Sequence, residues 1–484
     1  MRRAAIVLGI SAAASALAFA GEREARACGG CFQPPAQTAT DITDERMLLS
    51  VSPKQTTLYD QIRYSGNPKS FAWVLPIKGT VDVGLSADVL FDSVDVLTQT
   101  TIPAPTINCA PPPSNCQFGS SASAPNGGGF GGKGAGDVTV TKAENVGPYA
   151  TVQLHATDSS ALETWLADNG FTIPAAQKPI IDQYVKEGFD FLAMKLLPNQ
   201  GVSSMRPVRV TAPGASLSLP LRMAAIGTGA TVGITIWVVS DGRYEPQNFP
   251  FFHIDDKDLV WDFQTSSSNY TTLRAQHATE SQNKGWEMET SLELNQALIS
   301  NVINSGGRYY GGQGGGGGGV AGGPPSDPSQ DYLPITASTP DGGADGGTME
   351  TAEQVRADDI KTLFAGLTGP NVRVTRMRSD IAQVAMKTDF VLRASADQSE
   401  LPNIRVVTNT LNATCPVYDG CQVVGSAPAN ADGTAAGGPA GSAGCAATGS
   451  TSASDLKYAG LFGVVGLAAI TFLRRRRARA AKAS

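Results

Sequence analysis

Residues 231–239 read TVGITIWVV, a stretch in which only Thr231, Gly233 and Thr235 are not strongly apolar. A strand buried on both faces carries a nearly continuous apolar run of this kind, whereas a half-buried strand alternates. We therefore predict a central strand here. Runs rich in β-branched and aromatic residues predict further strands at residues 57–64, 71–77, 189–197, 372–377 and 385–392.

Turn and helix signals lie between these runs. Gly66-Asn67-Pro68 favours a turn, so the strands on either side of it are expected to form a hairpin. Ser86 can cap a helix that runs to about Leu97. Apolar residues at helical spacing predict three more helices, around residues 160–169, 180–187 and 355–367. Because helices and strands do not alternate strictly, we predict an α+β fold, a single mixed domain followed by one C-terminal transmembrane helix.

Three stretches rich in glycine or other small residues lie at residues 110–136, 305–347 and 425–454. Such chain loses much conformational entropy on ordering and brings little apolar surface. We expect the first two to be Gly/Pro-rich insertions in one domain at residues 28–400. The third is expected to belong to a Cys-containing, low-complexity stalk at residues 401–455.

The segment between the two chain ends is acidic. Residues 28–456 hold 26 Lys and Arg against 41 Asp and Glu, a net charge of −15. That charge repels phosphate backbones, so we exclude nucleic acid as a partner and leave an envelope protein, a polysaccharide or a cation as ligand classes. The three histidines (His155, His253 and His277) are scattered, and we predict no cofactor.

The first 27 residues have the features of an export signal. Arg2 and Arg3 precede an apolar run that ends at Ala20, and cleavage after Ala20 or Ala27 would follow a small residue. The second site would make Cys28 the first mature residue, but Arg26 fits a lipoprotein signal badly. We predict a signal peptide at residues 1–27 and an exported product; an uncleaved anchor helix is the alternative.

The other end contains a second apolar run, residues 458–473, followed by Arg474, Arg475, Arg476 and Arg477. Sixteen residues reach about 24 Å, less than the roughly 30 Å hydrocarbon core, but flanking Lys and Arg can snorkel. We predict a transmembrane helix at 456–473 and an Arg-rich cytoplasmic tail at 474–484. The acidic domain would then lie outside the cytoplasm, in the cell envelope.

Two resemblances follow from these residues. Cys445, a small-residue spacer, the short apolar run and the arginine cluster resemble the MYXO-CTERM sorting tail of myxobacteria-like organisms. That resemblance implies processing near Cys445 by a sorting machinery and surface anchoring, with the helix either retained or removed. An ordinary single-span anchor beside an unpaired cysteine is the alternative.

The domain itself resembles the bacterial domain-of-unknown-function family numbered 2330, whose members look like exported proteins. The resemblance spans roughly residues 28–396 and implies one domain with the glycine-rich tracts as insertions; it brings no activity and no catalytic residues. It is carried by Cys28-Gly29-Gly30-Cys31-Phe32, Glu45-Arg46-Met47-Leu48-Leu49, Tyr64-Ser65-Gly66-Asn67, Phe71-Ala72-Trp73-Val74-Leu75-Pro76, Gly147-Pro148-Tyr149, Pro220-Leu221-Arg222 and Val374-Thr375-Arg376.

The cysteines are candidates for disulfides. Cys28 and Cys31 have the spacing of a redox pair or of half a zinc site, but no strand precedes them and no second pair has matching spacing. For an exported chain we expect local bonds instead. The expected pairs are Cys28–Cys31, Cys109–Cys116 and Cys415–Cys421, with Cys445 left over.

Asp255, Asp256 and Asp258, close to His253, are weak candidates for a metal site or for acid–base chemistry. Their spacing matches no calcium loop, and a solvated turn is the simpler interpretation. We expect a membrane- or surface-anchored envelope protein with an acidic ectodomain in a binding or structural role. An envelope hydrolase that uses clustered carboxylates is the alternative.

Overall fold

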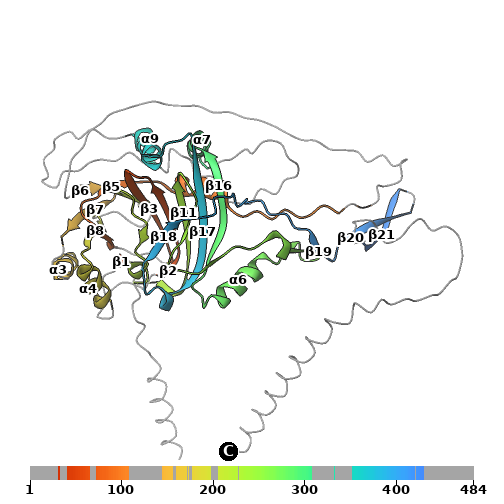
Figure 1. Cartoon of the computed structure of the whole chain (residues 1–484), viewed down its shortest axis with the longest axis horizontal. Coiled ribbons are helices and arrows are strands. Elements are labelled where there is room, and N and C mark those ends of the chain that lie inside the picture. Colours follow the sequence, from red (N-terminus) through yellow and green to blue (C-terminus); the bar gives the residue numbers. More distant parts are fainter. Residues whose placement is uncertain are drawn as a thin grey trace, which may run out of the picture.

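The computed structural model of the chain describes residues 31–32, 41–65, 72–107, 109, 144–155, 160–171, 173, 177–197, 205–226, 228–307, 332, 351–419 and 421–429. Within these ranges two main sheets pack face to face, and helices cover the outer face of each (Figure 1). The molecule is therefore a layered mixed α/β domain, in agreement with the predicted mixture of helices and strands.

The larger sheet has eight strands in the order β13-β16-β17-β11-β2-β3-β9-β5. β11 lies in its middle, antiparallel to β17 and parallel to β2, which confirms the central strand predicted at residues 231–239. The strands span Phe251–Phe252 (β13), Trp286–Asn295 (β16), Asn371–Ala382 (β17), Thr228–Ser240 (β11), Asp41–Val51 (β2), Gln55–Ser65 (β3), Val208–Pro213 (β9) and Asp82–Leu85 (β5).

The smaller main sheet has five antiparallel strands in the order β1-β4-β8-β7-β6. They span Cys31–Phe32 (β1), Ala72–Ile77 (β4), Asp190–Leu196 (β8), Tyr149–Leu154 (β7) and Glu144–Val146 (β6). Every residue of β4 is buried, because helices cover one of its faces and the larger sheet covers the other.

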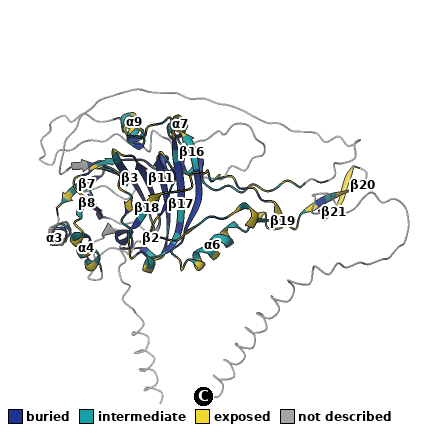
Figure 2. Cartoon of the chain, viewed as in Figure 1, coloured by how far each residue is buried: buried dark blue, intermediate teal, exposed yellow. Residues whose placement is uncertain are grey.

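Short strands complete the domain. One three-stranded sheet consists of β10 (Ser218–Leu219), β18 (Phe390–Ala394) and β12 (Tyr244–Pro246). A second consists of β15 (Ser267–Ser268), β14 (Val260–Asp262) and β19 (Asn409–Leu411). A hairpin is formed by β20 (Thr414–Asp419) and β21 (Gln422–Pro428). Figure 2 shows this hairpin as an exposed arm beyond β19. The segment expected to be a stalk thus begins with paired strands.

Side-chain alternation along β11 separates two cores. Ile234, Ile236 and Val238 pack between the two sheets, whereas Trp237 and Val239 pack under the helices on the outer face. Burying side chains of this size contributes about 1.5–3 kcal/mol each. The helices on the outer face of the larger sheet are α2 (Asp88–Thr98), α7 (Gln296–Asn304) and α9 (Ala352–Leu363); those on the smaller sheet are α3 (Ser160–Asp168), α4 (Lys178–Lys186) and α5 (Leu221–Ala224).

Helix α6 (Tyr270–Glu280) has no buried residue and lies near the end of β17 (Figure 1). None of the described helices is long and apolar enough to span a membrane. The residues predicted to form the transmembrane helix and Arg474–Arg477 lie outside the described ranges.

Two local predictions were wrong. β3 and β4 do not form a hairpin: β3 pairs with β2 and β9 in the larger sheet, while β4 pairs with β1 and β8. The two strands therefore lie in different layers, because a turn signal does not fix the partner of the next strand; Gly66-Asn67-Pro68 itself lies outside the described residues. Ser86 does not cap α2 either, because its hydroxyl donates to Asp359 Oδ2 at 2.6 Å.

Candidate functional site

The acidic residues singled out in the sequence lie on one surface segment, and two of them are paired with basic side chains. Asp255 Oδ2 accepts a hydrogen bond from Lys257 Nζ at 2.7 Å, and Asp256 Oδ1 accepts one from Arg405 Nη1 at 3.3 Å. The Asp258 side chain is exposed. In the described ranges no three His, Cys, Asp or Glu side chains are grouped so as to hold a metal ion. Asp256 thus anchors the segment around Arg405.

The cysteines pair over a long distance. Cys109 is bonded to Cys415, with 5.4 Å between their Cα atoms and 306 residues between them in sequence. The expected pairs Cys109–Cys116 and Cys415–Cys421 were therefore wrong, and Cys421 has a disulfide of its own. Short spacing did not decide the partner, because the fold brings residue 109 beside β20. Cys31 lies in β1, whereas Cys28, Cys116 and Cys445 fall outside the described residues.

A different acidic pair lies in the interior, between the two main sheets. Glu45 on β2 and Asp60 on β3 both line one cavity. Met47 is the cross-strand partner of Asp60 and also lines the cavity, two residues beyond Glu45 on the same face of β2. The two acids therefore occupy a face on which the following residues, Leu49 and Val51, are apolar core.

Burial perturbs both carboxyl groups. Glu45 is 2% exposed and Asp60 is 5% exposed. Desolvation raises the pKa of Asp60 to about 7. Desolvation, and after it the charges of Asp60 and Asp44, raises the pKa of Glu45 well above its usual range. Both groups therefore keep protons at pH values where exposed carboxyls have lost theirs.

The cavity offers space and free acceptors. Within the described ranges, neither Glu45 Oε2 nor Asp60 Oδ1 has a hydrogen-bond partner. The cavity has a volume of about 20 Å³, which is enough for one water-sized group. Apolar groups form the remaining walls, contributed by Met47, Leu58, Trp73, Val74, Leu75, Pro220, Met223 and Ala224.

No basic side chain is among the described residues that line this cavity. Arg222 lies in the same short helix as the lining residues Met223 and Ala224, but its guanidinium donates to Glu187 and Asp389 at 2.6–2.8 Å. The acidic pair therefore lacks the cation that would normally compensate two buried carboxyl groups.

A second buried acidic pair makes the contrast clear. Tyr270 Oη donates to Glu287 Oε1 at 2.8 Å, and Arg376 Nε lies 2.6 Å from Glu289 Oε2. Burial and the neighbouring Glu289 raise the pKa of Glu287 to about 7. Glu287 Oε2 also has no hydrogen-bond partner among the described residues, but this pair has a donor from α6 and a cation from β17, and these contacts hold the elements together.

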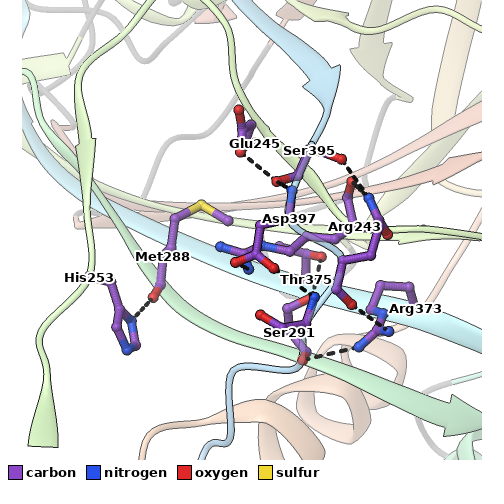
Figure 3. A network of polar contacts seen from close by, with 11 residues as sticks. Arg243, Glu245, His253, Met288, Ser291, Arg373, Thr375, Ser395 and Asp397 are labelled. Atoms are coloured by element: carbon purple, nitrogen blue, oxygen red, sulfur yellow. Dashed lines mark hydrogen bonds and ion pairs between the residues drawn. The ribbon is translucent and has the colours of Figure 1, made fainter.

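Another polar network joins the segment after β18 to the larger sheet (Figure 3). Each of its members is paired inside the protein, which indicates a structural role. The contacts are Ser395 Oγ to Glu245 Oε2 at 2.6 Å, Arg243 Nη1 to Asp397 Oδ2 at 3.2 Å, Ser291 Oγ with Thr375 Oγ1 at 3.1 Å, Arg373 Nη1 to the Ser291 carbonyl at 3.5 Å, and His253 Nδ1 with the Met288 carbonyl at 2.9 Å.

Sequence reasoning missed Glu45 and Asp60 as a pair. A local signal was present, since Glu45 stands two residues before Met47 on the apolar face of a strand. Because polar residues are rare at such positions, the register of β2 would have marked Glu45. Its partner on β3 and the wall from β4 come from other segments and required the fold.

Among solved structures, baculovirus P35 matches with a TM-score of 0.26 and 8% sequence identity, over 74% of this chain and 97% of that chain; a similarity this low carries no argument. No curated protein matches the sequence. Residues 23–391 match the family described as "Uncharacterized protein conserved in bacteria (DUF2330)". The chain belongs to this bacterial family.

Proposed function

We propose that this chain is an exported, membrane- or surface-anchored envelope protein whose domain binds a small cation between its two main sheets. The observation that carries the binding role is the acidic pair of Glu45 and Asp60. Both carboxyls are nearly fully buried, line the same cavity and have an oxygen without a partner in the described structure. A bound cation would supply the compensation that the surrounding side chains do not.

Export is supported by the chemistry of the chain. Disulfides persist in oxidising compartments, and Cys109–Cys415 joins the C-terminal hairpin to a segment 306 residues away. Residues 1–27 and 456–484 have the composition of a signal and of an anchor with a basic flank. The acidic domain would then face the exterior, where cations are its natural ligands.

Cation binding is tested on the full chain in detergent at pH 8, with choline chloride balancing the ionic strength. We expect the midpoint of thermal unfolding to rise as choline is replaced by a small cation, because ligand that binds only the folded state stabilises it. Asp60→Asn and Glu45→Gln should lose this response. The surface variant Asp258→Asn is the matched control and should keep it; an equal response in all four proteins would contradict the proposal.

Anchoring by the sorting tail predicts that Cys445→Ala releases or mislocalises the protein. The expected result is a change in the mass of the mature protein and its loss from the membrane fraction. Cys31→Ala, which removes a cysteine far from the tail in sequence, controls for a general effect of thiol loss. An unchanged mass and an unchanged membrane fraction would exclude processing at Cys445.

A further inference from the structure

We infer that the ligand group in the cavity between the sheets is a single primary ammonium head. This inference rests on the proposed cation-binding role and specifies its ligand. It follows from the charge of the site, its donors and acceptors, and the chemistry of its walls.

The charge of the site calls for a single positive charge. Glu45 and Asp60 lie in one cavity, with Asp44 as the other acid whose charge acts on Glu45. Two neighbouring buried carboxyls resist losing both protons, so at pH 8 the pair carries about one negative charge, most of it on Asp60. A monovalent cation matches that charge, while a divalent ion would require both protons to leave.

The hydrogen-bonding pattern calls for a donor with at least two N–H groups. The unpartnered atoms are Glu45 Oε2 and Asp60 Oδ1, and both are acceptors. A primary ammonium has three N–H groups and can donate to both of them. A quaternary ammonium has the same charge and no N–H, so it leaves both acceptors unsatisfied.

The walls disfavour a metal ion. Hard metal ions take six or more oxygen ligands, but Met47, Leu58, Trp73 and Met223 present carbon, sulfur and an indole to the cavity. An aromatic ring is a favourable neighbour for an ammonium. The cavity volume of about 20 Å³ fits one ammonium head and excludes a planar guanidinium.

The decisive experiment compares methylammonium, the smallest primary ammonium, with tetramethylammonium, sodium and potassium, by calorimetry and thermal unfolding of the full chain in detergent at pH 8. We expect methylammonium to bind and raise the unfolding midpoint, with the other three at least tenfold weaker. Between pH 8 and pH 6 the affinity should fall about tenfold, because the ligand binds the form in which Asp60 is ionised.

Glu45→Gln and Asp60→Asn each replace a buried carboxyl group by an amide of similar shape and are expected to fold; each should weaken methylammonium binding at least tenfold, with Asp258→Asn unchanged. If sodium or potassium binds through Glu45 and Asp60 as tightly as methylammonium, the cation site stands and the ammonium inference is wrong. If no cation responds to the two substitutions, the proposed function itself is wrong. Methylammonium binding that survives both substitutions would also overturn the inference.

Discussion

Asp60→Asn is expected to make the protein more stable at pH 8, by about 2–4 kcal/mol, and to have little effect near pH 4. Burial raises the pKa of Asp60 from 3.8 in ordinary surroundings to about 7, so the folded protein holds this proton more tightly than the unfolded chain. The wild-type protein therefore loses stability as the pH rises from about 4 to about 7. The uncharged amide removes this loss.

Thermal unfolding of the full chain in detergent, followed from pH 4 to pH 8 in choline chloride, measures this effect. The midpoint of Asp60→Asn at pH 8 should exceed that of the wild type by roughly 3–6 °C. Glu287→Gln provides a comparison, because Glu287 also has a raised pKa of about 7 but is hydrogen-bonded to Tyr270. A wild-type midpoint that rises between pH 5 and pH 8, unchanged by Asp60→Asn, would exclude a buried Asp60 with a raised pKa.

Asp359→Ala is expected to destabilise the domain by about 3–5 kcal/mol. The Asp359 side chain on α9 is fully buried, where it accepts hydrogen bonds from Ser86 Oγ at 2.6 Å, Tyr332 Oη at 2.8 Å and Arg209 Nη1 at 3.2 Å. Removing the carboxylate leaves two buried hydroxyls and a largely buried guanidinium without this acceptor.

The neighbouring Asp358→Ala is the matched control for this prediction. Asp358 also pairs with Arg209, but its side chain is 54% exposed. An exposed ion pair contributes about 0–1 kcal/mol, so the control should stay close to the wild type. Chemical denaturation of both variants at pH 7 measures the difference, and equal midpoints would show that α9 is not held by the buried carboxylate.

The strongest local patterns predicted the elements well. The apolar run at residues 231–239 marked β11, and helical spacing marked α4 and α9 close to their observed bounds. β16 and α7 were not predicted. β16 begins with six buried residues that include Glu287, Glu289, Thr290 and Ser291, so its sequence has no apolar pattern from which burial could be predicted. Only its position between β13 and β17 explains that burial.

Strand partners were the least predictable feature. β2 pairs in parallel with β11, although about 180 residues separate them, and the disulfide partner of Cys109 lies 306 residues away. Long-range pairing depends on which apolar faces of strands and helices remain to be buried. The entropic cost of closing a longer loop grows only slowly with its length. Nearness in sequence was therefore a poor guide at Gly66-Asn67-Pro68 and at the cysteines.

The sequence by itself determined the acidic charge of the domain and the central strand, because composition and periodicity act locally, and its motifs carried the resemblance to the family. The tertiary structure alone decided the candidate site. Asp60 becomes a buried acid only when β3 pairs beside β2, and the cavity closes only when β4 and α5 pack over that pair. A pKa is raised by what surrounds the carboxyl group, and those surroundings come from four separate segments of the chain.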